Sequence, residues 1–317
     1  MFRFLFFLLL LSSFASAQES EFNLKNPGDY NNFIMNEVII TVQKNFEYIS
    51  LSVHSEDYDQ LELKRKEVVD VISKSKENIR EMPALEGDTR LRDEAVEVLN
   101  EYKSAFELDF KSILGLKRKS KDSYEAMEAY FQAQDKAEEK VNKATRQLRK
   151  AQRVYAERNN MKVVDTKSDD LLELKMNKIS GVNDYWRSLF LDYFRVSKQY
   201  DKMWDALSEQ KAGPLSHQRE LTLKLIDQVL PQLKAKPSYR NDSEFRDQTI
   251  NMVEYYQGVA KTDFARIIEV LTKKSMEQTD VAEVNAIIAK CNADHEQLAY
   301  NWNIASQDLF RKNIDKE

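Results

Sequence analysis

The chain has 317 residues, of which 42% are hydrophobic and 32% are charged, fractions that are typical of a folded, well-solvated protein rather than a disordered one. Its formal net charge of −5 argues against a nucleic-acid partner, because proteins that bind nucleic acids carry basic patches that neutralise phosphates. The single cysteine excludes an intrachain disulfide, so packing must supply the stability.

The first predicted element is a secretory signal peptide over residues 1–17. Arg3 supplies a positive charge, residues 4–11 form an apolar run, and residues 15–17, Ala-Ser-Ala, form a small-residue cleavage site. The apolar run is well short of the ~20 residues that a transmembrane helix needs. We therefore expect export, cleavage and a mature chain without a transmembrane segment. An uncleaved anchor is the weaker alternative, and a bacterial lipoprotein is disfavoured because no cysteine follows the cleavage site.

Helices are predicted for most of the remaining chain. The six glycines and five prolines mostly fall between periodic segments and mark their ends. The segments between them are about 20 to 37 residues long, whereas strands typically have about 3 to 10. We expect helices near residues 31–54, 57–81, 88–119, 122–159, 183–209, 214–235, 242–275 and 280–314, with a connection at 161–182 that includes a short helix at 171–176.

One sequence pattern occurs twice. Residues 83–94 read PALEGDTRLRDE, and residues 237–248, which lie 154 positions later, read PSYRNDSEFRDQ. From residue 83 to residue 114, eight of 32 positions are identical at this offset, and the apolar positions follow the same helical spacing. A period this long indicates a duplicated domain rather than a solenoid repeat. The sequence therefore predicts an all-α protein, an elongated tandem duplication of an antiparallel four-helix bundle, with bundles at 18–160 and 183–317.

The repeated motif has a structural interpretation at each position. A proline ends the preceding helix because it lacks an N–H, a glycine or asparagine suits a left-handed turn, and an aspartate caps the next helix. A ligand- or cation-binding loop is the alternative, although the motif has fewer oxygen ligands than a calcium loop. The turn and cap positions are Pro83, Gly87 and Asp88 in the first copy and Pro237, Asn241 and Asp242 in the second.

No motif predicts a catalytic, cofactor-binding or metal site. His54, His217 and His295 all lack the Glu-x-x-His arrangement of di-iron bundles. His295 and Glu296 begin like the H-E-x-x-H zinc motif, but Ala299 replaces its second histidine. Haem-attachment and phosphate-loop motifs are also missing. We expect a protein that is not an enzyme and binds no cofactor. A carboxylate-dependent envelope hydrolase is the least favoured alternative.

A basic stripe is the first candidate surface for a partner. No acidic residue occurs between residues 140 and 156, whereas the aligned residues 294–307 contain no lysine or arginine. Such a stripe suits an acidic envelope protein, anionic lipid headgroups or lipopolysaccharide. The simpler alternative is a solvated face balanced by acids on neighbouring helices. The stripe consists of Lys140, Lys143, Arg146, Arg149, Lys150 and Arg153.

An aromatic cluster in residues 185–204 is the second candidate surface. Five of its members share one helix face and are predicted to lie in the core. We expect the other two, Tyr185 and Phe194, to contact a partner or the surface between the two domains. The cluster consists of Tyr185, Trp186, Phe190, Tyr193, Phe194, Tyr200 and Trp204.

Residues 26–30, NPGDY, residues 83–89, PALEGDT, and the long charged helix that ends near residue 159 resemble a family of exported bacterial all-helical proteins of unknown function, often labelled surface proteins. The resemblance covers the first half well and the second half more loosely, where Asn-Asp-Ser at 241–243 replaces Gly-Asp-Thr at 87–89. It implies a periplasmic or outer-surface location and a non-enzymatic role. We expect an exported interaction or scaffold protein of the cell envelope, and a soluble periplasmic small-ligand-binding protein is the alternative.

Overall fold

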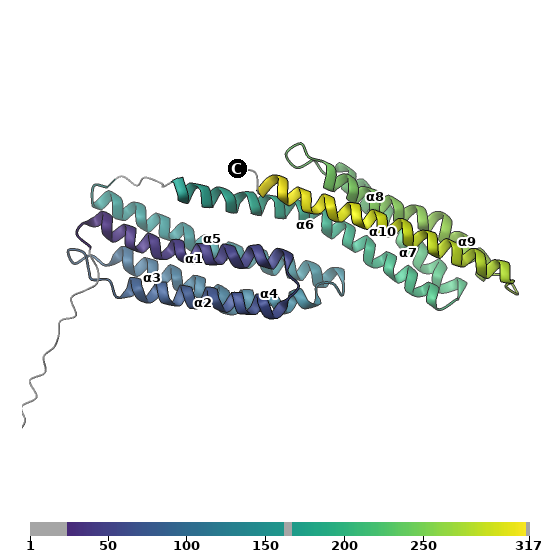
Figure 1. Ribbon diagram of the computed structural model, residues 1–317, viewed down its shortest axis with the longest axis horizontal. Helices are drawn as coiled ribbons and strands as arrows, with labels where there is room; N and C mark the ends of the chain where they lie inside the picture. The colour runs from purple at the N-terminus through teal and green to yellow at the C-terminus, as the bar shows by residue number, and fades with distance from the viewer. Residues whose placement is uncertain (1–23, 162–166, 315–317) are drawn as a thin grey trace, which may run out of the picture. The chain divides into compact units, whose positions relative to one another are not determined.

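The computed structural model describes residues 24–161 and 167–314, except for the side chains of residues 53, 54, 167–177 and 314. Within these ranges the protein is all-helical and has no strand, which confirms the all-α part of the predicted fold class (Figure 1). Among the described helices, none combines the length and the apolarity that crossing a bilayer requires. The predicted signal peptide, residues 1–17, lies outside the described residues.

One compact unit contains the described residues of Met1–Asp109 and Glu138–Val163. Helix α2 contacts both α1 and α3, and α5 joins them through hydrogen bonds, such as that from Gln152 to Asn31 at 3.1 Å. Buried apolar side chains fill the space between the helices. The elements of this unit are α1 (Pro27–His54), α2 (Tyr58–Arg80), α3 (Arg90–Ser104), the π-helical turn η1 (Ala105–Asp109) and the C-terminal part of α5 (Tyr124–Arg158).

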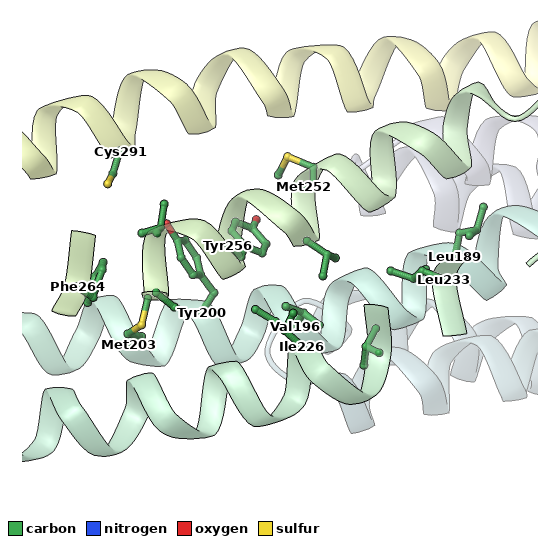
Figure 2. Packing of buried hydrophobic residues seen from close by; sticks show 14 of the residues in the cluster. Leu189, Val196, Tyr200, Met203, Ile226, Leu233, Met252, Tyr256, Phe264 and Cys291 are labelled. Carbon is green, nitrogen blue, oxygen red and sulfur yellow. The ribbon is translucent and has the colours of Figure 1, made fainter. Parts of the chain in front are cut away.

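The other unit contains the described residues of Phe110–Ala137 and Val164–Glu317. Helix α6 contacts α7 and α10, and α8 contacts α7 and α10. Figure 2 shows Tyr200 and Met203 from α6, Met252 and Tyr256 from α8, and Cys291 from α10 extending into the interior between the helices. The elements are α4 (Phe110–Lys119), the N-terminal part of α5, α6 (Lys167–Ser208), α7 (Ala212–Ala235), α8 (Glu244–Gly258), the π-helical turn η2 (Val259–Asp263), α9 (Phe264–Leu271) and α10 (Gln278–Ile314).

The units do not coincide with the domain boundaries that the sequence predicts. The first predicted domain, residues 18–160, includes all of α5, whereas the N-terminal part of this helix groups with the second unit. Aromatic and ionic contacts account for this grouping. The Phe131 ring lies 6.2 Å from the Trp186 ring, and Arg187 Nη1 lies 2.6 Å from Asp135 Oδ1.

Helix α6 begins earlier than the sequence predicts. Instead of starting near residue 183, it starts at Lys167 and continues without a break through Gly181. A glycine inside a helix costs about 1 kcal/mol relative to alanine, which packing can offset. Here a Cβ atom on Gly181 would lie 3.0 Å from the Tyr239 hydroxyl oxygen. The glycine therefore allows the close approach of a side chain, and it does not mark the end of a helix.

The two copies of the repeated motif form the same tight turn. In the first, Leu85 and Asp88 exchange backbone hydrogen bonds of 3.2 and 2.8 Å across Glu86 and Gly87. Glu86 has a φ of 50° and Gly87 a φ of 82°. Left-handed backbone at both central positions is the φ pattern of a type I′ turn, which explains the glycine. The second turn repeats this geometry with Tyr239, Arg240, Asn241 and Asp242.

The capping position lies one residue later than the sequence predicts. Because α3 starts at Arg90, its N-cap is Thr89, whose hydroxyl donates to Asp93 at 2.7 Å instead of accepting from the helix. Asp88 still serves the helix start, since its Oδ1 accepts from the Arg90 N–H at 3.0 Å. The Arg90 guanidinium beside it lowers the pKa of Asp88 to about 2. In the second copy, the Ser243 hydroxyl donates to Asp247 at 2.6 Å, and Asp242 Oδ1 accepts from the Glu244 N–H at 3.0 Å.

The π-helical turns also lie 154 residues apart, between α3 and α4 and between α8 and α9. Each inserts a wider turn into a helix, which disturbs the regular backbone hydrogen bonds. In each unit an arginine from a neighbouring helix, α2 or α7, compensates for this. Arg65 Nη1 donates to the Phe106 carbonyl and Arg219 Nε to the Ala260 carbonyl, both at 2.6 Å.

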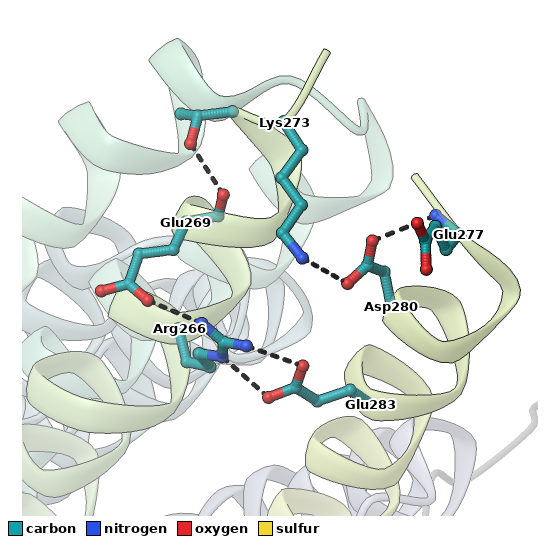
Figure 3. A network of polar contacts seen from close by, with 7 residues as sticks. Arg266, Glu269, Lys273, Glu277, Asp280 and Glu283 are labelled. Atoms are coloured by element: carbon teal, nitrogen blue, oxygen red, sulfur yellow. Dashed lines mark hydrogen bonds and ion pairs between the residues drawn. The ribbon is translucent and has the colours of Figure 1, made fainter. Parts of the chain in front are cut away.

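An ionic network holds the corner between α9 and α10 (Figure 3). Arg266 pairs with both carboxylate oxygens of Glu283, at 2.7 and 2.9 Å, and with Glu269 at 2.9 Å. Lys273 Nζ lies 2.5 Å from Asp280 Oδ1. The second oxygen of Asp280 accepts from the Glu277 N–H at 3.0 Å, so this carboxylate also caps the start of α10.

Candidate functional site

The basic stripe lies on the outer face of α5. Ala144 and Leu148 are buried, whereas Lys143, Lys150 and Arg153 are exposed. These three cations are seven and three residues apart, a spacing that places them along one side of a helix. The structure therefore presents part of the predicted stripe as a continuous cationic face.

The members of the stripe differ in their partners. Lys140 Nζ lies 3.1 Å from Asp109 Oδ2 and 3.1 Å from the Ser104 hydroxyl, so a neighbouring element balances its charge. Arg146 pairs with Glu139 at 2.7 Å on its own helix. Arg149 is also not free, since it takes part in a polar, ionic or ring contact. Within the described ranges, the remaining three cations, Lys143, Lys150 and Arg153, have no ion pair. The simpler interpretation of a fully balanced face thus holds for only part of the stripe.

The equivalent face of α10 has a different chemistry. At an offset of 154, Arg146 corresponds to Tyr300 and Lys150 to Ile304. Tyr300 is 63% exposed and Ile304 is 42% exposed. One unit therefore presents cations where the other presents an aromatic and an aliphatic side chain.

Neither Tyr185 nor Phe194 is an exposed partner residue in the structure. Phe194 is buried, with its ring 5.4 Å from that of Phe190. Tyr185 is half-buried and packs on Tyr239, whose ring centre lies 5.1 Å away. Both side chains help to pack the second unit, because their rings are already covered by neighbouring aromatic side chains.

The second unit contains a groove of about 930 Å³, which we call the tyrosine groove. Its walls come from α6, α7 and α10, with a short contribution from the start of α5 and the two residues before it. The lining residues are Asp122, Ser123, Tyr124, Glu125, Tyr193, Arg195, Ser197, Lys198, Gln199, Tyr200, Asp201, Lys202, Trp204, Asp205, Leu221, Leu225, Cys291, Asn292 and His295.

A chain of hydrogen bonds joins two lining residues of the tyrosine groove, Tyr193 and His295, through Tyr256, which is buried and does not itself line the groove. The Tyr193 hydroxyl lies 3.3 Å from the Tyr256 hydroxyl, which lies 3.1 Å from Nε2 of His295. Burial raises the pKa of both tyrosines and lowers the pKa of His295. At neutral pH the wall is therefore uncharged, with protonated hydroxyls and a neutral imidazole.

Tyr200 is a buried lining residue of the tyrosine groove. This side chain is 4% exposed, and its ring stacks 4.1 Å from that of Tyr256. Its hydroxyl makes no hydrogen bond to any group in the part of the chain that the structure describes. Burial raises the pKa of Tyr200 to about 12 and that of the nearby Cys291 thiol to about 11. Both groups stay protonated at neutral pH.

The sequence motifs do not predict this groove. His295 matches only the start of a zinc motif, in which Ala299 replaces the second histidine. Comparison of the two copies contains the missing signal. At an offset of 154, His295 corresponds to Val141, Cys291 to Ala137 and Trp302 to Leu148. One face of α10 therefore carries polar and aromatic residues at positions where α5 carries smaller apolar ones.

The described residues contain no cluster of three or more histidine, cysteine or acidic side chains that could hold a metal ion. Comparison of the chain with protein-family models, with curated proteins and with solved structures gave no match.

Proposed function

We propose that the chain arose by tandem duplication of one antiparallel four-helix bundle. Contacts that recur at a constant offset of 154 support this proposal. The tight turns, the helix starts and the arginine bonds to the π-helical turns all recur at this offset. A hydrogen bond between the first and last helices of each bundle has a counterpart: Gln152 bonds to Asn31, and Ser306, 154 positions after Gln152, bonds to Trp186, 155 positions after Asn31. Two unrelated bundles would not share so many irregular features.

Its function, in this proposal, is that of an exported, non-enzymatic interaction protein of the bacterial cell envelope, and α5 supplies the binding face. The exposed cations of α5 without an ion pair carry the proposal. Lys143, Lys150 and Arg153 lie on one face of a helix whose other face is anchored in the core. A rigid cationic face of this kind suits a partner with an acidic face, because complementary potentials accelerate and orient the encounter.

An acidic protein fits this face better than a lipid surface does. Glu139 and Glu157 flank the stripe and are both exposed, so they would be repelled by a flat anionic bilayer. The stripe also offers little apolar area for insertion, since Val154, at 37%, is the exposed large aliphatic residue beside it. A discrete acidic patch on a protein could contact the cations and avoid both glutamates.

Charge reversal tests the binding face. A variant with Lys143→Glu, Lys150→Glu and Arg153→Glu is compared with a control carrying Lys111→Glu, Lys224→Glu and Lys274→Glu, at exposed positions on α4, on α7 and in the loop before α10. Partners are recovered by crosslinking in intact cells and quantified at low and moderate salt. We expect the stripe variant, but not the control, to lose one stoichiometric protein. Equal recovery with both variants would overturn the proposal, and so would salt-sensitive binding to anionic vesicles alone.

Export is tested separately on the full-length chain. We propose cleavage after residue 17, so that the mature protein begins at Gln18 and is found in the periplasm or on the outer surface. Fractionation of cells, followed by mass spectrometry of the N-terminal peptide, measures both. A full-length chain retained in the cytoplasm would contradict this part of the proposal.

A further inference from the structure

We infer that the tyrosine groove binds a neutral, hydroxyl-rich small molecule, of which a short oligosaccharide is the best fit. This site is separate from the basic face of α5 and goes beyond the proposed interaction role. Its volume of about 930 Å³ lies within the range of about 300–1,000 Å³ that is usual for small-molecule pockets.

The unpaired hydroxyl of Tyr200 is the first reason. Buried polar groups in folded proteins nearly always have a hydrogen-bond partner, and an exception calls for an explanation. Tyr200 lines the groove, and its buried hydroxyl oxygen lies beside the Trp204 and Tyr255 side chains but completes a hydrogen bond of regular geometry with no described residue. A ligand hydroxyl can supply what is missing, because it both donates and accepts.

The uncharged inner wall is the second reason. Tyr193, Tyr256 and His295 form a continuous chain of hydrogen bonds next to Tyr200. Their protons can be rearranged within this chain, so that the wall donates to a ligand or accepts from it. A charged ligand would find no opposite charge at this depth, whereas an alcohol group would find donors and acceptors.

The outer wall carries both signs of charge. Along α6, the cations Arg195, Lys198 and Lys202 alternate with the carboxylates of Asp201 and Asp205, and all five line the groove. Lys198 and Asp201 lie 3.6 Å apart. An anion or a cation would meet like charges as well as opposite ones. A neutral polyol can donate to the carboxylates and accept from the cations without that repulsion.

Aromatic side chains supply the apolar part of the site. Tyr193 and Trp204 are partly exposed and line the groove. Rings of this kind have an apolar body beside a polar tip, so they can cover the C–H face of a sugar while its hydroxyls reach the polar walls. A purely apolar ligand would leave the charged rim without partners.

The test uses the mature protein and a fixed panel of probes. Maltotriose, cellotriose and triacetylchitotriose are the neutral probes, and inorganic phosphate, citrate and spermidine are the charged ones. Binding is measured by saturation-transfer NMR and calorimetry up to about 10 mM, the range in which weak affinities are still measurable. We expect at least one trisaccharide to bind saturably and the charged probes not to bind.

Two groove variants and one control locate the site. Tyr200→Phe and Asp201→Asn should each weaken trisaccharide binding by about tenfold, the effect of losing one hydrogen bond to the ligand. The control, Tyr102→Phe, removes a hydroxyl from the first unit and should leave the affinity unchanged. Asp201 is exposed, so its variant keeps the test valid even if Tyr200→Phe were to disturb the packing. The proposal is overturned if no trisaccharide binds, if only charged probes bind, or if both groove variants bind as the wild type does.

Discussion

Arg65 links α2 to the backbone of a π-helical turn through a single bond to Phe106. Its Nη1 atom donates to the Phe106 carbonyl at 2.6 Å, while Nε and Nη2 pair with both oxygens of Glu62 at 2.8 and 2.7 Å. The residue is 5% exposed. One guanidinium therefore neutralises its own charge and satisfies a carbonyl that an irregular turn has left open.

Arg65→Gln should destabilise the protein by about 2–3 kcal/mol, because a hydrogen bond from a charged group is lost and a buried carbonyl loses its donor. Urea unfolding followed by circular dichroism measures this change in the free energy of unfolding. Glu62→Gln is the control, since it keeps the bond to Phe106 and should cost less. A loss for Arg65→Gln within about 0.5 kcal/mol of zero would contradict the structural role of the arginine.

Gly87→Ala and Gly115→Ala should have opposite effects on stability. Gly87 has a φ of 82°, where a Cβ atom adds about 1 kcal/mol of strain. Gly115 lies exposed in α4, and an added Cβ would have no atom within 4 Å. Alanine at this position should stabilise the protein by about 0.5–1 kcal/mol through the lower entropy of the unfolded chain. Thermal unfolding of the two variants measures both effects, and a Gly87→Ala variant as stable as the wild type or more stable would refute the assigned turn.

Tyr200→Phe and Tyr102→Phe should also differ in sign. The Tyr102 hydroxyl is bonded to the Thr145 hydroxyl, so its removal should cost about 1 kcal/mol. The Tyr200 hydroxyl has no partner in the described chain, and its removal should be neutral or stabilising. Unfolding by urea in the absence of sugars measures both variants. If Tyr200→Phe is clearly destabilising, its hydroxyl is already satisfied in the free protein.

His295 should weaken the fold as the pH falls below about 6.5, the pKa of a free histidine. Burial lowers the pKa of His295 in the folded protein, although the carboxylate of Asp201 acts in the opposite direction. Between the folded and unfolded pKa values the unfolded state binds more protons, so stability decreases with falling pH until the folded histidine also titrates. His295→Gln should therefore lose less stability than the wild type between pH 7.5 and pH 5.5. His217→Gln, at an exposed position on α7, is the control and should behave as the wild type does. A wild-type pH dependence in the His295 variant would show that other groups cause the loss.

The regular parts of this fold were predictable, because apolar spacing and turn residues act locally. The helix that follows Pro83 and the left-handed Gly87 are examples, since each depends on a few neighbouring residues. The uninterrupted course of α6 through Gly181 was not predictable. The reason for this glycine is the close approach of the Tyr239 hydroxyl, which comes from a residue 58 positions later in the chain.

The tyrosine groove was not predictable either, because it also depends on contacts between residues that are far apart in the sequence. Tyr193, Tyr256 and His295 come from three helices and meet only when the bundle forms. The π-helical turn after Tyr256 also shifts the register of the following residues, and the apolar pattern alone does not reveal such a shift. The only sequence signal for the groove described above is the difference between one face of α10 and the aligned face of α5.

Cys291 gives the protein a practical property. Its thiol is 1% exposed, and burial raises its pKa to about 11. At pH 7 only about one thiol in ten thousand is ionised, and the thiolate is the reactive form. A cysteine introduced at an exposed position such as Tyr300 would then be the one readily alkylated group on the described chain. A fluorophore or crosslinker could be attached to a single chosen site without removing the native cysteine.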